Sequence, residues 1–196
     1  MSLNEYFARK QIQGIEGHCG QIPQQMSDLR AAAKTATRIL EIGFNAGHSA
    51  EVFLESSAGA VVSFDLGAHD YTAEGKEFID KKFPGRHTLI LGNSHTTLRD
   101  YAQTKPQAFD LIFIDGDHTY EGALTDLLDS YPLAASGATI IVDDVIKTPQ
   151  LFVADWNAGP TSAWDTLKSM HAMKEIDYKE YGYMGRGMVI GHWLST

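Results

Sequence analysis

The most constraining feature of this sequence is a series of five short apolar runs that alternate with longer, mixed segments. Each run is nearly continuously apolar and rich in branched side chains, as in strands buried on both faces of a parallel sheet. Each intervening segment is long enough for one crossover helix. The pattern therefore predicts an α/β fold whose parallel strands are Arg38–Ile42, Val61–Phe64, Thr88–Leu91, Asp110–Ile114 and Ala138–Val142.

The C-terminal part predicts a helix followed by a pair of strands. The helix is expected from Ser162 to Lys174, and the strand-like runs are Ile176–Tyr181 and Gly187–Trp193. The segment 182–186 between them has the glycines of a hairpin turn. The complete prediction is an α/β, Rossmann-like three-layer sandwich with a seven-stranded, mostly parallel sheet and an antiparallel C-terminal edge hairpin.

The composition is that of a globular chain with an acidic surplus. Hydrophobic residues make up 43%, and 25 acidic against 16 basic residues give a formal net charge of -9. Binding to phosphates needs a basic face, so we expect no nucleic-acid partner. No apolar run approaches the ~20 residues that span a bilayer, and the first residues lack a signal-peptide pattern. Because the single Cys19 can form no internal disulfide, these features together favour a cytoplasmic protein without a membrane partner.

Glycine and acidic residues follow the predicted strands, where ligands bind in open α/β sheets. After the first strand, Gly43 and Gly47 allow a tight turn and a close approach of a ligand to backbone N–H groups. The loop is not the G-x-G-x-x-G dinucleotide fingerprint, because Asn45 replaces the middle glycine. Asp65 ends the second strand, where an acidic side chain can accept hydrogen bonds from both hydroxyls of a ribose.

In combination, four motifs resemble the class I S-adenosylmethionine-dependent methyltransferases over roughly residues 38–145. They are the loop E-I-G-x-x-x-G from Glu41 to Gly47, the acidic Asp65, the segment 92–94 after the third strand, and the block 109–122 around the fourth. That block looks like the small O-methyltransferases that include macrolide sugar methyltransferases and cephalosporin-hydroxylase-like proteins. The resemblance implies S-adenosylmethionine as the cofactor.

The resemblance also assigns individual residues to parts of this cofactor. It implies contacts with the ribose at Asp65 and with the adenine at Asn93 and Ser94, and it adds Asp115 to the binding residues. Around the methionine part it implies Glu41, Gly43, Asn45, Gly47 and Ser49. The alternative is that the glycines form a plain strand-to-helix turn and that Asp65 is a helix N-cap.

Three aspartates, Asp115, Asp143 and Asp144, end the fourth and fifth predicted strands. If these strands are neighbours, as in the family, their carboxyl ends lie ~5 Å apart, and the carboxylates repel one another unless a cation lies between them. Hard divalent cations such as Mg²⁺ take oxygen ligands of this kind. Related metal-dependent O-methyltransferases place acidic ligands at these strand ends, and the resemblance carries a Mg²⁺ site over to the three aspartates. Helix capping and cofactor contacts are the alternative roles.

His118 lies three residues after Asp115 on the same loop. An imidazole with a pKa near neutrality suits a general base, and the resembling sugar methyltransferases use a histidine at this spacing in that way. The resemblance therefore implies that His118 and Asp115 are catalytic, with Mg²⁺ activating the acceptor hydroxyl. The alternative is a loop histidine that hydrogen-bonds the backbone or lies over the cofactor.

The predicted function is S-adenosylmethionine-dependent O-methylation of a small-molecule or sugar hydroxyl, assisted by Mg²⁺. The alternatives are a non-catalytic S-adenosylmethionine-binding module and a hydroxylase-like member of the resembling family. An NAD-dependent oxidoreductase is disfavoured because Asn45 interrupts the glycine fingerprint.

We expect residues 1–196 to form one domain. Its parts are an N-terminal helical segment at 1–36, a cofactor-binding core at 37–145, and a substrate-side helix and hairpin at 146–196. The stretch Lys147–Pro160 is a candidate lid, and the terminal segments are expected to select the acceptor. A homodimer is the default expectation for the oligomeric state.

Overall fold

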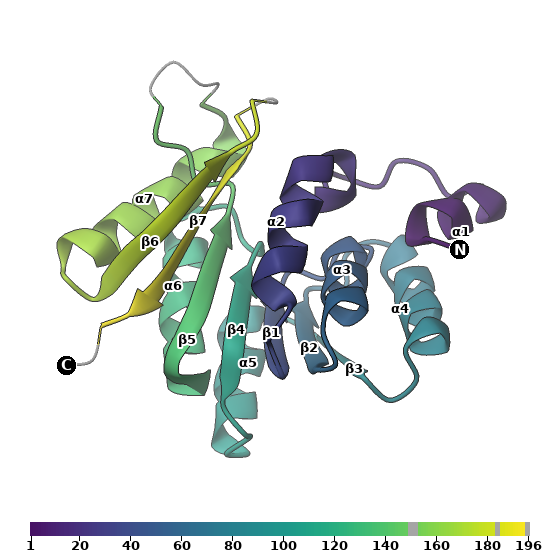
Figure 1. The fold of residues 1–196 in the computed structure, drawn as a ribbon, viewed down its shortest axis with the longest axis horizontal. Helices are drawn as coiled ribbons and strands as arrows, with labels where there is room; N and C mark the ends of the chain where they lie inside the picture. The colour runs from purple at the N-terminus through teal and green to yellow at the C-terminus, as the bar shows by residue number, and fades with distance from the viewer. Residues whose placement is uncertain (149–152, 183–184, 195–196) are drawn as a thin grey trace.

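A computed structural model describes residues 1–148, 153–182 and 185–194 of the chain (Figure 1). Seven strands form one sheet in the order β3-β2-β1-β4-β5-β7-β6. The first five are parallel to one another, whereas β7 is antiparallel to both β5 and β6. The predicted fold class is thus confirmed, with strands β1 Arg38–Ile42, β2 Ala60–Asp65, β3 His87–Leu91, β4 Phe109–Ile114, β5 Ala134–Asp143, β6 Met173–Glu180 and β7 Gly187–Trp193.

Helices cover both faces of the sheet and make the three layers. One hydrophobic core joins the sheet to the first four helices, and a second joins it to the last three. Figure 1 shows α2, α3 and α4 in front of the sheet and α5 and α6 behind it. The helices are α1 Leu3–Lys10, α2 Pro23–Ala33, α3 His48–Ser56, α4 Tyr71–Lys82, α5 Ser94–Gln103, α6 Tyr120–Ser130 and α7 Asp155–Ser169, with short 3-10 helices at Cys19–Gln21 and Tyr131–Leu133.

Strand β1 illustrates why the buried runs carry so few polar residues. Its successive side chains point to opposite faces, so Ile39 packs in the core with α1–α4 and Leu40 in the core with α5–α7. Both side chains are 0% exposed. Each buried side chain of this size contributes roughly 1.5–3 kcal/mol, and this favours a strand with apolar residues on both faces.

The C-terminal helix begins earlier than predicted. It spans Asp155–Ser169 and contains both Gly159 and Pro160, so the last part of the predicted lid is helical. Tertiary contacts outweigh the poor helix propensity of this glycine and proline. A Cβ atom on Gly159 would lie 2.1 Å from the carbonyl oxygen of His118, so glycine is what lets α7 pack this closely on that loop. Residues 149–152 of the predicted lid and 183–184 of the predicted turn lie outside the described residues.

The helix also ends earlier than predicted, and Lys174 belongs to β6. Strand β6 begins at Met173 and pairs with β7 along its length, with an irregularity between Glu175 and Asp177. The structure therefore extends the predicted strand at its beginning and stops it at Glu180. The physical reason is that β6 pairs with β7 through backbone N–H and C=O groups, so polar residues can extend the strand as well as apolar ones.

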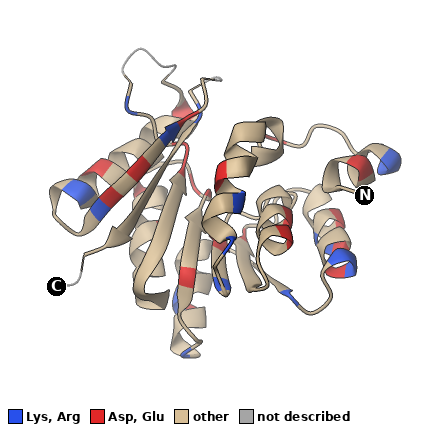
Figure 2. Ribbon diagram, in the orientation of Figure 1, with Lys and Arg blue, Asp and Glu red and all other residues tan. Residues whose placement is uncertain are grey.

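Charged residues of both signs share the surface helices. On α4, Lys76 pairs with Asp80 and Lys81 pairs with Glu77, and Figure 2 shows both colours along this helix. Such i,i+4 pairs stabilise a helix by about 0.2–0.5 kcal/mol each. Among the described residues, no helix combines the length and the apolar character that crossing a membrane requires.

Candidate active site

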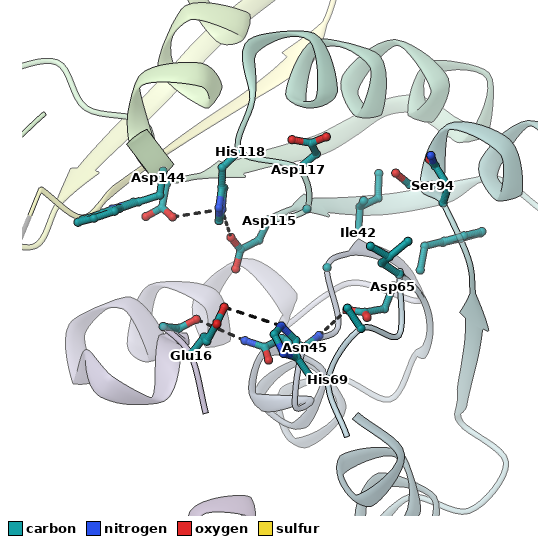
Figure 3. Close-up of a pocket in the computed structure, with 18 of the residues that line it drawn as sticks. Glu16, Ile42, Asn45, Asp65, His69, Ser94, Asp115, Asp117, His118 and Asp144 are labelled. Carbon is teal, nitrogen blue, oxygen red and sulfur yellow. Dashed lines mark hydrogen bonds and ion pairs between the residues drawn. The ribbon is translucent and has the colours of Figure 1, made fainter. Parts of the chain in front are cut away.

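A cavity of about 770 Å³ lies at the carboxyl ends of the parallel strands. Its lining includes one residue from the end of each of the five parallel strands or the loop that follows, namely Gly43, Asp65, Asn93, Asp115 and Asp144. Figure 3 shows Ser94 and Asp65 toward one side of this cavity and His118 and Asp144 toward the other. The volume is that of a site for a small molecule, and the position is where open α/β sheets bind ligands.

Asp65 is held by two backbone donors. The amide of Asn45 donates to Oδ2 at 2.7 Å, and the amide of Gly67 donates to Oδ1 at 2.7 Å. These bonds fix the carboxylate at the cavity wall, and each oxygen keeps a lone pair for a further donor. Asp65 is therefore not a helix N-cap, and its orientation suits a ligand with two adjacent hydroxyls.

Gly43 is required where the loop after β1 meets the loop after β4. Its φ is +94°, and a Cβ atom there would lie 1.9 Å from the carbonyl oxygen of Asp115. The amide of Asp115 also donates to the carbonyl of Ile42 at 2.8 Å. Because backbone occupies this space, the two loops can approach each other only with glycine at position 43.

Glu41, Gly47 and Ser49 are not among the residues that line the cavity. Glu41 is 0% exposed, and Ser63 donates a hydrogen bond to it. Burial raises its pKa to about 7, although hydrogen bonds from Ser49 and Ser63 act in the opposite direction. Gly47 precedes α3 at a φ of +94°, and its amide closes a tight turn with Phe44 at 2.7 Å. These residues support the loop from beneath, and a direct contact with the cofactor stays a prediction.

Asn93 and Ser94 lie where α5 begins, and both line the cavity. The side chain of Asn93 caps α5 by accepting a hydrogen bond from the amide of His95 at 2.9 Å. Ser94 donates to Asp126 on α6 at 2.6 Å, and His95 lies 3.6 Å from the same carboxylate. Asp126 is 0% exposed, and the sequence analysis missed it because it lies in the middle of a helix.

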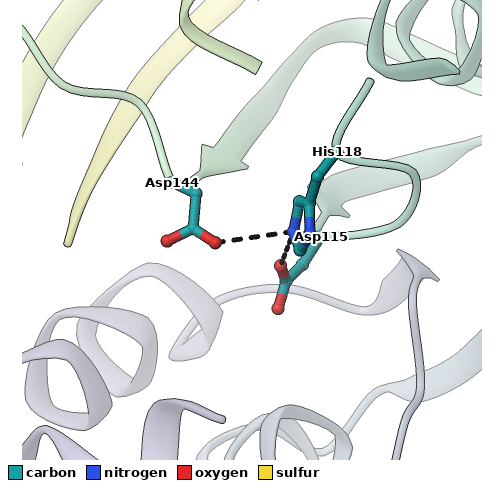
Figure 4. A group of neighbouring side chains, drawn as sticks. All are labelled: Asp115, His118 and Asp144. Atoms are coloured by element: carbon teal, nitrogen blue, oxygen red, sulfur yellow. Dashed lines mark hydrogen bonds and ion pairs between the residues drawn. The ribbon is translucent and has the colours of Figure 1, made fainter. Parts of the chain in front are cut away.

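Asp115, His118 and Asp144 form a compact group at the other side of the cavity (Figure 4). The Nε2 atom of His118 lies 3.3 Å from Asp115 and 3.4 Å from Asp144, and one ligand atom from each residue lies within 4.8 Å of the others. Burial lowers the pKa of His118, but the hydrogen bond to Asp115 and the negative charges of the aspartates outweigh it and raise the pKa to about 9. His118 is thus held where it can exchange a proton with a bound molecule.

The structure does not bring Asp143 into this group, contrary to the predicted acidic trio. Its carboxylate accepts hydrogen bonds from Gln25 at 2.8 and 2.7 Å on the face covered by α2. Asp143 is the last residue of β5, and the next residue, Asp144, has a φ of 56°. This turn of the backbone sends Asp144 into the cavity while Asp143 stays beneath it. The pKa of Asp143 is raised to about 6, mainly by burial and in addition by the charge of Asp115.

Arg186 is a second residue of this site that the sequence analysis missed. The sequence pattern predicts it in a hairpin turn, but its side chain is only 11% exposed and lines the cavity. Its guanidinium lies 3.0 Å from Asp144 and 3.6 Å from Asp143. The repulsion between the acidic strand ends is thus opposed by a cation from the chain itself.

These side chains do not fit the predicted Mg²⁺ site as they stand. Mg²⁺ takes oxygen ligands, commonly one or two carboxylates with waters, but here Asp143 is turned away and an imidazole lies between the remaining two carboxylates. Both carboxylates already contact His118, and Asp144 also contacts Arg186.

The N-terminal segment closes the cavity from the side of the first loop. Glu16, Gly17 and Gln21 line it, and the side chain of Asn45 donates to the carbonyl of Gly17 at 3.5 Å. Across the opening, His69 lies 3.8 Å from the carboxylate of Glu16. Trp156 contributes to the wall from α7. The sequence analysis expected the terminal segments to select the acceptor, but because they carry no motif it did not assign Glu16, Gly17 or Gln21 to the site.

The comparisons with known proteins agree with this geometry. Residues 40–145 match the family model described as a methyltransferase domain. Since the match covers more than half of the chain, the protein belongs to this methyltransferase family. The recognition made from the sequence motifs is therefore confirmed. A search of curated protein sequences gives no significant match.

Solved structures share the whole fold at low sequence identity. An O-methyltransferase from Bacillus cereus in complex with SAH is 19% identical, with a TM-score of 0.74 over 96% of this chain and 89% of that chain. The O-methyltransferase TomG from Streptomyces achromogenes, involved in tomaymycin synthesis and solved with SAM, is 16% identical, with a TM-score of 0.74 over 98% and 88% of the two chains. The SAH-bound methyltransferase PaMTH1 from Podospora anserina is 20% identical, with a TM-score of 0.68 over 98% and 88%. This chain therefore has the fold of S-adenosylmethionine-dependent O-methyltransferases.

Proposed function

We propose that this protein transfers the methyl group of S-adenosylmethionine to a hydroxyl oxygen of a small molecule, such as a sugar or a phenol. The observation that carries the proposal is the common cavity of two different groups. Asp65, fixed by two backbone amides, lies at one side, and the His118–Asp115 pair lies at the other. A binding site and a proton acceptor thus face the same space.

The cofactor would be held by residues that the structure already orients. Asp65 would accept hydrogen bonds from the ribose hydroxyls, the loop at Gly43 and Asn45 would face the methionine part, and Asn93 and Ser94 would lie near the adenine. The bound cofactor supplies an electrophilic methyl group on a positively charged sulfur. The protein's task is to align the acceptor oxygen with that carbon and to exclude water.

His118 would take the proton that the acceptor hydroxyl loses as the new carbon–oxygen bond forms. Asp115 and Asp144 stabilise the imidazolium that results, because each lies within 3.4 Å of its Nε2 atom. A binding-only module would need none of these three side chains, so their convergence favours catalysis over that alternative. It also favours proton removal from a hydroxyl over the hydroxylase-like reaction. A homodimer and a cytoplasmic location stay predictions from the sequence.

Calorimetric titration with S-adenosylhomocysteine tests the cofactor directly. We expect micromolar binding by the wild type. Asp65→Ala should lose at least about tenfold in affinity, or ~1.4 kcal/mol, because the acceptor for the ribose hydroxyls is removed. The matched control is Asp110→Ala. Asp110 also accepts backbone hydrogen bonds, from Thr37 and Arg38, but it lies at the opposite end of the sheet. It should lower stability and leave the affinity unchanged.

Turnover tests the reaction. Release of S-adenosylhomocysteine is measured with sugars and phenols as acceptors, for the wild type and for His118→Ala. We expect turnover with at least one hydroxyl acceptor and a much larger loss of turnover than of cofactor affinity in the variant. Absence of cofactor binding would refute the proposal, and equal loss of both quantities would make His118 a binding residue.

A further inference from the structure

The two carboxylates at the end of β5 are buried, and burial of a carboxylate is unfavourable unless a cation or several donors accompany it. Asp143 and Asp144 are each 2% exposed, and Asp115 follows the neighbouring strand β4. The fold therefore needs positive charge at this point.

Arg186 supplies that charge from a fixed position. Its carbonyl accepts a hydrogen bond from the amide of Tyr181 at 3.1 Å, and the next residue, Gly187, accepts one from Val145 at 3.1 Å. Gly187 packs so tightly that a Cβ atom there would lie 2.5 Å from the carbonyl oxygen of Val145. The backbone that carries Arg186 is thus held between β5 and β6.

The guanidinium is also enclosed by the N-terminal segment. A Cβ atom on Gly17 would lie 2.9 Å from Nη1 of Arg186, so this segment packs directly against it. On its other side the guanidinium faces Asp143 and Asp144. A divalent ion bound to Asp144 would share that carboxylate with the guanidinium of Arg186, which lies 3.0 Å from it, and the two positive charges would repel each other.

We propose that Arg186 is a positioning residue that takes the place of a divalent metal in this site. Its guanidinium holds Asp144 beside His118, and methyl transfer here needs no bound metal ion. The inference rests on the proposed function, but it concerns the charge at the acidic strand ends and can be tested separately. In this proposal, Arg186 provides the positive charge that the sequence analysis expected from Mg²⁺.

Binding of Mn²⁺, followed by the electron paramagnetic resonance signal of the free ion, tests the proposal on the full chain with S-adenosylhomocysteine present. We expect no Mn²⁺ binding by the wild type at millimolar concentration. Arg186→Met should bind Mn²⁺ with a Kd at least tenfold below the highest concentration at which the wild type shows no binding, because Asp144 and Asp143 lose the positive charge of the guanidinium. Arg186→Lys keeps the charge and should resemble the wild type. If Arg186→Met does not fold, Arg186→Gln removes the charge and keeps a hydrogen-bonding group.

Three results would overturn the proposal. The first is micromolar Mn²⁺ binding by the wild type that Asp144→Asn abolishes. The second is loss of wild-type turnover in chelator with recovery on adding Mg²⁺. The third is failure of the folded Arg186→Met variant to bind Mn²⁺, which would show that the guanidinium does not stand in a metal's position. S-adenosylhomocysteine affinity is measured on the same samples, so failure of the proposed function is recognised separately as loss of cofactor binding by the wild type.

Discussion

The hydroxyl of Ser94 donates a hydrogen bond of 2.6 Å to the carboxylate of Asp126, which is completely buried behind the cavity wall. The amide of Asp117 reaches the same carboxylate at 3.4 Å. Ser94 and Asp117 both line the cavity. One buried side chain on α6 therefore sets the position of two wall residues, one at the start of α5 and one in the loop after β4.

Substituting Asp126 should weaken both the fold and the cofactor site. Asp126→Ala leaves the hydroxyl of Ser94 and the amide of Asp117 without this acceptor, which should cost roughly 3 kcal/mol of unfolding free energy. Asp126→Asn keeps an acceptor oxygen, and burial already raises the pKa of Asp126, so we expect a smaller cost. Denaturant unfolding and titration with S-adenosylhomocysteine measure the two effects. Equal stability of Asp126→Ala and the wild type would contradict this role.

Gly43 and Gly85 make a matched pair for the backbone argument. Both have positive φ values, +94° and +73°, but a Cβ atom on Gly85 would meet nothing within 4 Å. Gly85→Ala should therefore cost about 1 kcal/mol, from backbone strain alone. Gly43→Ala places a Cβ atom against the carbonyl of Asp115. It should lower the free energy of unfolding by roughly 3 kcal/mol or more and also weaken cofactor binding. Thermal unfolding of both variants checks the difference, and similar losses would show that the loop can move.

The sequence predicted the sheet well because its strands are buried on both faces. Runs such as Arg38–Ile42 and Asp110–Ile114 have a composition that few other structures produce, and their places in β1 and β4 were nearly right. The start of α7 was predicted too late because Gly159 and Pro160 signal a loop locally. The close packing of Gly159 on the loop of His118, which decides the outcome, involves a distant part of the chain.

The residues of the site that could be predicted end a strand or lie in the loop that follows it. Asp65, Asp115 and Asp144 were found in this way, and all three line the cavity. Asp143 was placed with them because the sequence cannot tell which of two adjacent aspartates turns toward the cavity. Arg186 was missed because its partners are far away in the sequence, so no local spacing relates them.

The stacked pair His18 and His48 should make the fold sensitive to acid. Their ring centroids lie 3.6 Å apart, and His48 contacts Asn4 at 2.8 Å. Burial lowers the pKa of His48 from 6.5 to about 3, and the charge His18 would carry acts in the same direction. Since the unfolded chain binds this proton below pH 6.5 and the folded chain does not, the neutral ring's contribution is lost as the pH falls from 6.5 toward 3.

The difference between a variant and the wild type isolates this effect from other titrating groups. His48→Gln keeps a side chain that can hydrogen-bond and has no proton to gain. Between neutral pH and about pH 4.5 it should lose about 2 kcal/mol less stability than the wild type. The exposed His171→Asn is the control and should follow the wild type. Parallel stability curves for His48→Gln and the wild type would argue against a buried neutral ring.

The pH dependence of turnover should report His118. A general base must be unprotonated, and the pKa of His118 is raised from 6.5 to about 9 because the hydrogen bond to Asp115 and the nearby aspartates outweigh burial. The fraction of competent enzyme, and with it kcat/KM, should rise about tenfold per pH unit below this pKa and level off above it. The same shift means that protonated His118 stabilises the fold below pH 6.5, and that this contribution is lost as the pH rises through about 9.

Asp115→Asn provides the discriminating variant for this profile. It removes a negative charge and weakens the hydrogen bond that raises the pKa of His118, so the rise in kcat/KM should move to lower pH. Initial rates of S-adenosylhomocysteine release between pH 6 and 10, at fixed ionic strength, measure the profile for both proteins. A profile that is flat in the wild type, or whose rise stays at the same pH in Asp115→Asn, would mean that another group accepts the proton. A shift confined to the variant would connect the observed geometry of the pair to the chemical step.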